Sequence, residues 1–410
     1  MSSEEPRPLE LETTNPAERA PRKVAREAHP VLIWPGKKTP SERELVHAAD
    51  RAGNERFLTV FDPGSNVDAP SSLILGDNAK AMKALLNESS SLAGSVRLCY
   101  LDPPYNTGET FSTYHDSRPV DDWLNALSER LTLVRSLLRA DGSVWLHLDD
   151  NHQHHGRMLL DEVFGPHAFV ATVIWQKRTT RDSRRAFSQS HDYIHVYSPL
   201  GNKGWKQVRN GLPDSGEFKN PDGDPRGSWR SVPMSAQAGH ATRAQFYDVV
   251  TPTGEVHSPP PGRCWSYSKE RLAELDADGR VYWPRKGAGR PRLKRYESES
   301  SDLAPLTIWD SGFAGDTSVA KKELLASFPG ESRFDTPKPE LLLRRILEIG
   351  SNPGDLVLDP YLGSGTTGVV AAQTARRFIG IESSETVLRD VAVPRLEASL
   401  ARGTFSIFKA

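Results

Sequence analysis

A glycine-rich turn between a buried strand and a helix constrains the fold of this chain more than any other feature. GDLVLDP (354–360) has the apolar run of a buried strand, and GSGTTG (363–368) then opens a helix that extends to residue 375. RRFIGIE (376–382) follows as a second strand that ends in an acid. Strands that alternate with helices in this way predict a mostly parallel α/β sheet.

The first half of the chain shows the same alternation. Apolar strands and helical periodicity alternate in SLILGDN (72–78), AKAMKALL (79–86), SVRLCYLDPPYN (95–106), DDWLNALSERLTLVRSLLRADG (121–142), SVWLHLDD (143–150), MLLDEVFG (158–165), FVATVIWQ (169–176) and YIHVYS (193–198). Near the other end, Thr336 is expected to cap a helix with Pro337 at its first position and Gly350 at its end. The sequence therefore predicts one sheet that is assembled from both ends of the chain.

The middle of the chain reads differently. Residues 177–330 are rich in Gly and Pro and have only short strand-like pieces, which predicts an irregular inserted α+β domain. Residues 176–300 contain 22 Lys and Arg against 14 Asp and Glu, although the whole chain has a net charge of -1. A basic surface confined to one segment favours a polyanionic partner. The expected organisation is a disordered polar tail (1–30), a catalytic part (31–176), the insert (177–330) and a cofactor-binding part (331–410).

Several classes of protein do not fit this composition. No apolar run approaches the roughly 20 residues that span a bilayer, and the polar opening MSSEEPRPLE is not expected to act as a secretory signal. Cys99 and Cys264 are the only cysteines among the 410 residues, which favours a reducing cytoplasm over a disulfide scaffold. Four histidines lie within 147–155, but we interpret them as a solvated face and expect no metal site.

The glycine-rich turn is typical of a site for an adenosine-containing cofactor. Gly363 and Gly365 let the backbone approach a ligand, and the turn with its Ser364 and Thr366 places free N–H groups at a helix N-terminus. Glu382, at the end of the next strand, can accept both ribose hydroxyls. The turn lacks the lysine of a phosphate-binding loop. By itself it does not distinguish a nicotinamide dinucleotide from S-adenosylmethionine.

LDPPYNTG (101–108) favours S-adenosylmethionine. Asp102 follows an apolar strand at the edge where open α/β sheets bind ligands, and Pro103 and Pro104 stiffen the backbone beside the Tyr105 ring. The Asp102 carboxylate and the Pro103 carbonyl can each accept one hydrogen of an exocyclic amine, which directs the nitrogen lone pair toward an incoming methyl group. Tyr105 can stack on the base, which must be flipped out of a duplex to be reached.

Together these motifs resemble the amino-methyltransferases that act on DNA, in the β arrangement, where the catalytic motif comes before the target-recognition domain and the cofactor motif comes last. More narrowly, the chain resembles the modification subunit of type III restriction–modification systems and its stand-alone adenine-specific relatives. The resemblance covers roughly residues 72–382 and is carried by GDNAKAMKAL (76–85), LDPPYNTG (101–108), LLRADGSVWLHLDD (137–150), DEVFG (161–165), HDYIHVYS (191–198), PPGRCWSYSKERLAELDADGRVYWP (260–284), TPKPELL (336–342) and LDPYLGSGTTG (358–368).

The resemblance implies a Rossmann-like S-adenosylmethionine-dependent methyltransferase fold and assigns further roles. Asp77 matches the acid near the cofactor adenine, and Asp359 matches the residue beside the methionine amino group. Thr336 and Lys338 match the motif that closes over the methionine end, where Lys338 can pair with its carboxylate. The chain is shorter than type III subunits, and Tyr361 replaces their usual Phe.

The expected activity is methyl transfer to adenine N6 in duplex DNA, without a metal or a covalent intermediate. N4-cytosine methylation uses the same machinery and is the alternative, although Asp102 before PPY favours adenine in the family. An NAD-dependent oxidoreductase would leave LDPPYNTG unexplained, and a silent DNA-binding module would not need Asp102. The expected partners are double-stranded DNA, a restriction subunit and a second copy of the chain. The basic residues expected to contact DNA are Arg178, Arg181, Arg184, Arg185, Arg290, Arg292 and Lys294.

Overall fold

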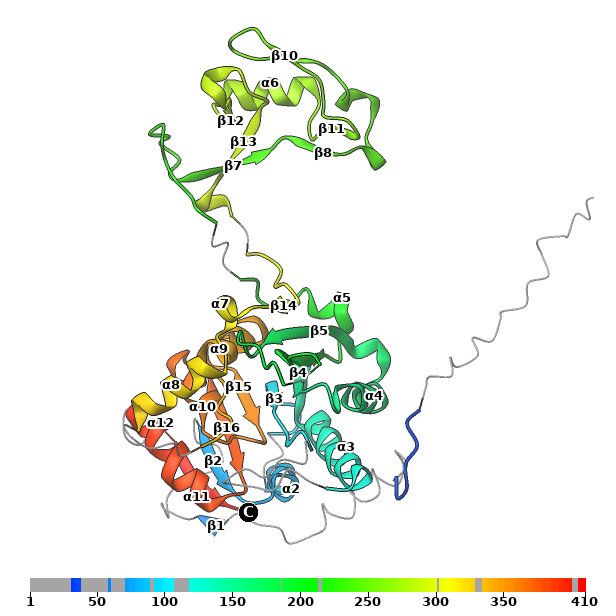
Figure 1. Ribbon diagram of the computed structural model, residues 1–410, viewed down its shortest axis with the longest axis vertical. Coiled ribbons are helices and arrows are strands. Elements are labelled where there is room, and N and C mark those ends of the chain that lie inside the picture. Colours follow the sequence, from blue (N-terminus) through cyan, green and yellow to red (C-terminus); the bar gives the residue numbers. More distant parts are fainter. Residues whose placement is uncertain are drawn as a thin grey trace, which may run out of the picture.

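The computed structural model describes residues 31–37, 58–59, 71–88, 92–106, 118–184, 186–212, 216–300, 302–328, 334–399 and 405–410. The tail expected over residues 1–30 lies outside these ranges. An α/β body surrounds one large sheet, and a smaller unit projects from it (Figure 1). No helix in the described ranges has the length and apolar character needed to cross a membrane.

Within the described ranges the large sheet has ten strands, and its centre is parallel. In spatial order they are β1 (Leu58–Thr59), β17 (Ser406–Lys409), β2 (Ser72–Leu75), β16 (Arg377–Glu382), β15 (Leu356–Asp359), β3 (Val96–Leu101), β4 (Leu138–Leu148), β6 (His191–Tyr197), β5 (Phe169–Gln176) and β14 (Ile308–Trp309). The strands from β17 to β4 are parallel, and β6 is antiparallel to both of its neighbours. The C-terminal strands β15 and β16 lie between the N-terminal strands β2 and β3. The predicted assembly of the sheet from both chain ends is therefore confirmed.

Helices cover both faces of this sheet. One face packs against α2 (Asn78–Glu88), α3 (Val120–Leu137) and α4 (Gln153–Phe164). The other packs against α5 (Gly201–Trp205), α7 (Ser311–Ala314), α9 (Glu340–Gly350), α10 (Thr366–Gln373) and α12 (Val393–Ser399). In β3, Cys99 and Leu101 point to the first face, and Leu98 and Tyr100 to the second. A strand that is buried on both sides needs apolar residues at consecutive positions, which explains why this segment reads as a continuous apolar run.

Further helical elements complete the body. They are η1 (Pro166–Ala168), α8 (Thr317–Ser327), α11 (Glu385–Val387) and the π-helix η6 (Leu388–Ala392). Two predicted boundaries are wrong. The helix expected over 121–142 ends at Leu137, where β4 begins. Thr336 does not cap a helix, because α9 begins at Glu340 after Pro339. A residue before proline avoids helical backbone angles, so Lys338 cannot belong to the helix.

Residues 216–300 form the smaller unit. Its elements are β7 (Trp229–Pro233), β8 (Ser235–Gln237), η2 (Ala238–His240), η3 (Arg243–Gln245), β9 (Val249–Val250), β10 (Val256–His257), β11 (Arg263–Trp265), α6 (Lys269–Ala277), β12 (Val281–Tyr282), η4 (Arg285–Gly287), β13 (Arg292–Tyr296) and η5 (Glu297–Glu299). They form small antiparallel sheets around their own core, which includes Met234, Trp265 and Leu272. The unit is therefore an irregular insert with both helix and strand.

The insert is narrower than the expected range of 177–330. β14 pairs with β5, and Thr317 donates to the carbonyl of Lys177, so the chain after residue 302 has returned to the large sheet. Leu212 and Leu303 exchange two backbone hydrogen bonds of 2.9 and 2.7 Å. The chain thus enters and leaves the smaller unit at adjacent points.

Candidate active site

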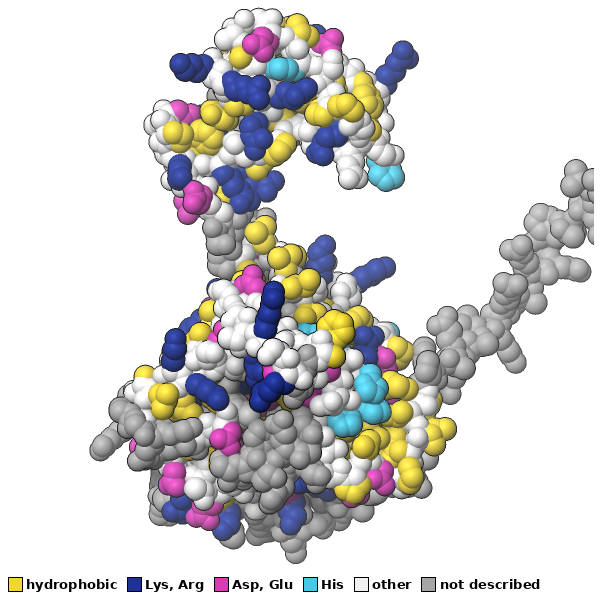
Figure 2. All heavy atoms as spheres, in the orientation of Figure 1, with side chains coloured by type: hydrophobic (Ala, Val, Ile, Leu, Met, Phe, Trp, Pro, Cys, Tyr) yellow, Lys and Arg dark blue, Asp and Glu magenta, His cyan; other side chains and the backbone are white. Residues whose placement is uncertain are grey.

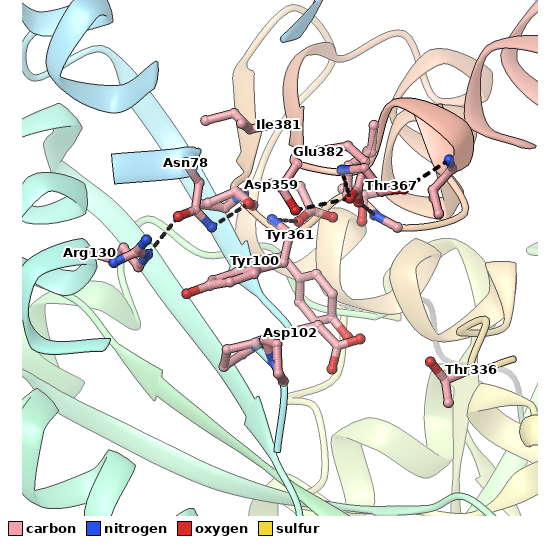
Figure 3. A pocket seen from close by; sticks show the side chains of 18 of the residues that line it. Asn78, Tyr100, Asp102, Arg130, Thr336, Asp359, Tyr361, Thr367, Ile381 and Glu382 are labelled. Atoms are coloured by element: carbon pink, nitrogen blue, oxygen red, sulfur yellow. Dashed lines mark hydrogen bonds between the residues drawn. The ribbon is translucent and has the colours of Figure 1, made fainter. Parts of the chain in front are cut away.

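One cavity lies where the central parallel strands end. It has a volume of about 350 Å³ and is lined by residues from the carboxyl ends of β2, β3, β15 and β16 (Figure 3). Ligands of open α/β sheets bind at this edge, next to the point where the strand order reverses. The cavity brings together every predicted catalytic residue and all but one of the predicted cofactor residues: Asp77, Asp102, Pro103, Pro104, Tyr105, Thr336, Lys338, Asp359, Gly363, Ser364, Thr366 and Glu382.

Both oxygens of the Asp102 carboxylate have partners. The Tyr105 hydroxyl donates to Oδ1 at 2.7 Å, and the Lys338 ammonium donates to Oδ2 at 2.5 Å. The Lys338 ammonium also lies 5.4 Å from the centre of the Tyr105 ring. Burial and the negative charge of Asp102 raise the pKa of Tyr105, so the hydroxyl remains a donor at neutral pH.

The turn that carries Asp102 is held from α3. The Trp123 indole donates to the Pro104 carbonyl at 2.8 Å. Asn106, whose φ of 56° is unusual for a residue other than glycine, exchanges hydrogen bonds with the backbone of Arg118. The last two residues of the LDPPYNTG motif lie outside the described ranges. The described part of the turn is fixed at its proline-rich centre and at its end.

A buried polar chain lies behind this turn. The Tyr100 hydroxyl is 2.8 Å from Nδ1 of His147, and Nε2 of His147 is 3.3 Å from Asp192. Lys177 donates to the other oxygen of Asp192 at 2.6 Å. Burial lowers the pKa of His147, so the ring stays neutral. His147 lies in β4 and is fully buried, so the sequence interpretation of a solvated histidine face is wrong for this residue.

The glycine-rich turn has the backbone that its sequence requires. Gly363 and Gly365 have φ values of 52° and 82°, which side chains other than that of glycine rarely allow. A Cβ on Gly363 would lie 3.0 Å from the Phe334 ring. Glu382 closes the turn, because its carboxylate accepts the backbone N–H groups of Gly363 and Ser384 at 2.9 and 2.8 Å. Gly365 shapes the turn without lining the cavity.

Asp359 is the most unusual carboxylate in the cavity. It is 3% exposed and accepts the backbone N–H of Tyr361 at 2.9 Å. Burial, together with the charges of Asp102 and Glu382, raises its pKa to about 7. A buried acid of this kind is stabilised by a cation, so the position suits an ammonium or sulfonium group.

Asp77 and its neighbour Asn78 join the adenine side of the predicted cofactor site to α3. Asp77 accepts the N–H groups of Ala79 and Lys80 and therefore caps α2. Arg130 donates to Asp77 at 2.8 Å and to Asn78 at 2.6 Å, and Asn78 donates to the Pro360 carbonyl at 2.9 Å. Asp77 thus lines the cavity but also has a structural role.

Ser364 and Thr366 face a buried arginine. Arg395, which is 2% exposed, donates to the Thr366 hydroxyl at 2.8 Å and to Glu340 at 3.1 Å. The Thr366 hydroxyl in turn donates to the Lys338 carbonyl at 3.2 Å. These contacts connect the glycine-rich turn to the segment that precedes α9, where Thr336 also lines the cavity.

Sequence reasoning missed several residues of this site. Asn78, Tyr100, Arg118, Trp123, Arg130, Phe334 and Thr367 line the cavity and were not predicted. Trp123 and Arg130 are seven residues apart, two turns along the amphipathic helix that was predicted, and therefore share a face. Arg130, a charged residue on a mostly apolar helix face, was the feature of the sequence that could have indicated a role in the site.

The predicted DNA contacts have different environments. Arg178, Arg181, Arg184 and Arg290 are exposed, and Arg184 pairs with Asp182; Arg185 lies outside the described residues. The prediction for Lys294 is wrong on geometry, and Arg292 is half-exposed but also makes contacts within the insert. Lys294 is 8% exposed and pairs with Asp222 and Asp224 at 2.5 and 3.0 Å. Arg292 donates twice to Ser231 and so holds β13 against β7.

The sequence matches a family of N6- and N4-methyltransferases described as DNA methylase over residues 96–393, more than half of the chain. The chain belongs to this DNA methylase family. The DNA methylase is 32% identical to the Type II methyltransferase M.EcaI of Enterobacter cloacae, and the match covers 90% of this chain and 79% of that relative.

A second relative is much longer than this DNA methylase. It is the Mod subunit of the Type III restriction-modification enzyme StyLTI of Salmonella typhimurium, 30% identical over 78% of this chain and 53% of the relative. The chain therefore spans about half the length of that subunit. Membership of the DNA methylase family confirms the predicted family and its cofactor, S-adenosylmethionine, and the sheet order confirms the predicted α/β fold.

Proposed function

We propose that this chain transfers a methyl group from S-adenosylmethionine to the N6 amino group of adenine in duplex DNA. The observation that supports this most is the position of Asp102 and Tyr105 in the cavity that also holds the glycine-rich turn. A carboxylate acceptor beside an aromatic ring suits a flat base with an exocyclic amine. The name of a DNA adenine methyltransferase from Escherichia coli, 24% identical over 75% of this chain, supports adenine as the base.

The cavity residues fit the cofactor. A methyl-bearing sulfonium and an ammonium are cations, and the buried Asp359 carboxylate is suited to them. Glu382 ends β16 as expected of an acid that accepts ribose hydroxyls, and Gly363 has no side chain to occupy the space beside the Phe334 ring. When it is bound, the cofactor supplies an electrophilic methyl group.

The residues of the chain then act on the base. Tyr105 stacks on the ring, and Asp102 together with the Pro103 carbonyl accepts the two amino hydrogens. This arrangement directs the nitrogen lone pair toward the methyl group and stabilises the positive charge that develops on nitrogen. The hydrogen bond from Trp123 fixes the adjacent Pro104 carbonyl, so the turn needs no reorganisation during the reaction.

The insert is the proposed DNA-recognition part, with boundaries near 216–300. Lys and Arg side chains are spread over its surface (Figure 2). A second cavity, of about 230 Å³, lies on this unit, and its lining includes Arg285, Arg290 and Arg292. Arg285 and Lys286 have φ values of 53° and 56°, a strained backbone that often marks a functional segment. We propose Arg285 and Lys286 as DNA contacts in addition to Arg290 and Arg292, and in place of the buried Lys294.

Salt titration tests this surface. The double variant Arg285→Glu/Arg290→Glu should bind duplex DNA more weakly, and each lost phosphate contact should reduce the slope of log affinity against log salt by roughly 0.9. Arg271→Glu, on α6, is the matched control, because Arg271 is also exposed but pairs with Glu274. Equal DNA affinity of the double variant and the control would show that this face does not contact DNA.

Protein partners belong to the proposal as well. One relative is a subunit of a restriction–modification enzyme, which supports a restriction subunit as a partner of this chain. Association with a second copy is also proposed.

Transfer of tritium from methyl-labelled S-adenosylmethionine to DNA tests the activity. Wild type should label DNA, and Asp102→Asn should lower labelling by at least a hundredfold because it removes the charge that stabilises the transition state. Digestion of the labelled DNA to nucleosides identifies the base. Label in N4-methylcytosine would overturn the choice of adenine, and full labelling by Asp102→Asn would overturn the mechanism.

A further inference from the structure

The Lys338 ammonium lies where the proposed mechanism places the amino group of the target base. It donates to Oδ2 of Asp102 at 2.5 Å and lies 5.4 Å from the centre of the Tyr105 ring. The base must make the same two contacts, a hydrogen bond to Asp102 and a stacking contact with Tyr105. Because the Tyr105 hydroxyl already binds Oδ1, Lys338 holds the other oxygen that the base amine needs.

The backbone at Lys338 is fixed, whereas its side chain is long. Pro337 and Pro339 flank the residue, and the Thr366 hydroxyl donates to its carbonyl at 3.2 Å. Four methylene groups separate this anchored backbone from the ammonium, so the charge can change its position without movement of the chain. Thr366 begins α10 at the end of the glycine-rich turn. The backbone of Lys338 is therefore bound to the glycine-rich turn, while its ammonium group contacts Asp102 in the catalytic turn.

We propose that Lys338 exchanges partners during the reaction cycle. In the free protein it pairs with Asp102 and occupies the place of the base; in the cofactor complex it pairs with the carboxylate of the methionine moiety and leaves Asp102 open. The inference rests on the proposed function, because it needs a cofactor that carries a carboxylate. Lys338 is then a positioning residue that makes cofactor binding a condition for base binding.

The exchange has a thermodynamic consequence. Since S-adenosylmethionine must draw Lys338 away from Asp102, the ion pair lowers the affinity of the free protein for the cofactor. Removal of the Asp102 charge should therefore strengthen cofactor binding, although Asp102 itself belongs to the base site. Couplings between sites in proteins are typically about 5- to 150-fold.

A double-mutant cycle measured by calorimetry tests the exchange in the full chain. Asp102→Asn should bind S-adenosylmethionine about fivefold or more tightly than wild type, and Lys338→Met should bind it more weakly. In the Lys338→Met background, Asp102→Asn should change nothing. The second ligand is 5′-methylthioadenosine, which lacks the methionine carboxylate and should bind all four proteins within about twofold of each other.

Lys37→Met is the matched control. Lys37 pairs with Glu162 at 2.7 Å and lies 4.7 Å from the centre of the Trp34 ring, the same combination of contacts as at Lys338, but outside the cavity. It should leave both affinities unchanged, and thermal unfolding should show that every variant is folded.

The outcomes distinguish a failure of the proposed Lys338 exchange from a failure of the proposed function. Unchanged or weaker binding of S-adenosylmethionine by Asp102→Asn would overturn the exchange alone. If Asp102→Asn raised the affinity for S-adenosylmethionine equally in the Lys338→Met background, the exchange would also be overturned, because the effect would then come from the charge of Asp102 and not from Lys338. Failure of the wild type to bind S-adenosylmethionine would overturn the proposed function, and the exchange with it.

Discussion

Asp359 shows how a single residue can oppose stability in favour of function. Its carboxyl group has a pKa of about 7 in the folded protein, against an ordinary value of 3.8. Because the folded-state pKa is the higher one, the bound proton stabilises the fold fully below pH 3.8, and this contribution is lost as the pH rises through 7. Above pH 7 the fold carries a buried charge without a cation.

The substitution Asp359→Asn should remove this penalty. We expect the free energy of unfolding at pH 8 to rise by on the order of 4 kcal/mol, and the gain to shrink as the pH falls toward 5. Denaturant titrations at both pH values measure this. The same variant should bind S-adenosylmethionine more weakly. Lower stability at pH 8 would contradict the account of this residue.

At the scale of elements, α3 positions both halves of the cavity. Trp123 holds the catalytic turn through Pro104, and two turns later Arg130 holds Asp77 and Asn78 beside the glycine-rich turn. The helix also packs with its apolar face on the sheet, so its register is fixed by burial.

Trp123→Phe keeps the ring in place but removes the hydrogen bond to Pro104. We expect methyl transfer to fall about fivefold, in line with roughly 1 kcal/mol for one hydrogen bond, while the affinity for S-adenosylmethionine stays the same. Single-turnover kinetics and calorimetry measure the two quantities. A loss of cofactor affinity equal to the loss in rate would place Trp123 in the cofactor site instead.

At the scale of the whole molecule, the proposal assigns DNA recognition to the insert and cofactor binding to the large sheet. Leu212 and Leu303 pair at the base of the insert, so a short Gly-Ser linker can join them without strain. The protein in which this linker replaces residues 213–302 should fold and bind S-adenosylmethionine but lose affinity for DNA. Calorimetry and a DNA mobility assay check this. Loss of cofactor binding in a folded deletion protein would mean that the insert completes the cavity.

The sequence predicted the parts of the molecule that depend on local patterns. The buried strands, the glycine-rich turn and the DPPY turn are each continuous in the chain, and the structure brings them together in one cavity. The pairing of Lys338 with Asp102 could not be predicted, because 236 positions separate the two residues and the contact depends on the sheet order. The prediction that Lys294 contacts DNA was wrong for a similar reason. Its basic segment indicated an exposed patch, but the ammonium pairs with two carboxylates that are distant in the sequence.

Sequencing that reports base modification tests the central claim most directly. DNA from cells that express the wild-type chain should carry N6-methyladenine at one recurring sequence, and DNA from cells that express Asp102→Asn should carry none at that sequence. Both proteins should be present at equal abundance. N4-methylcytosine at the recurring sequence, or adenine methylation that persists with Asp102→Asn, would contradict the account.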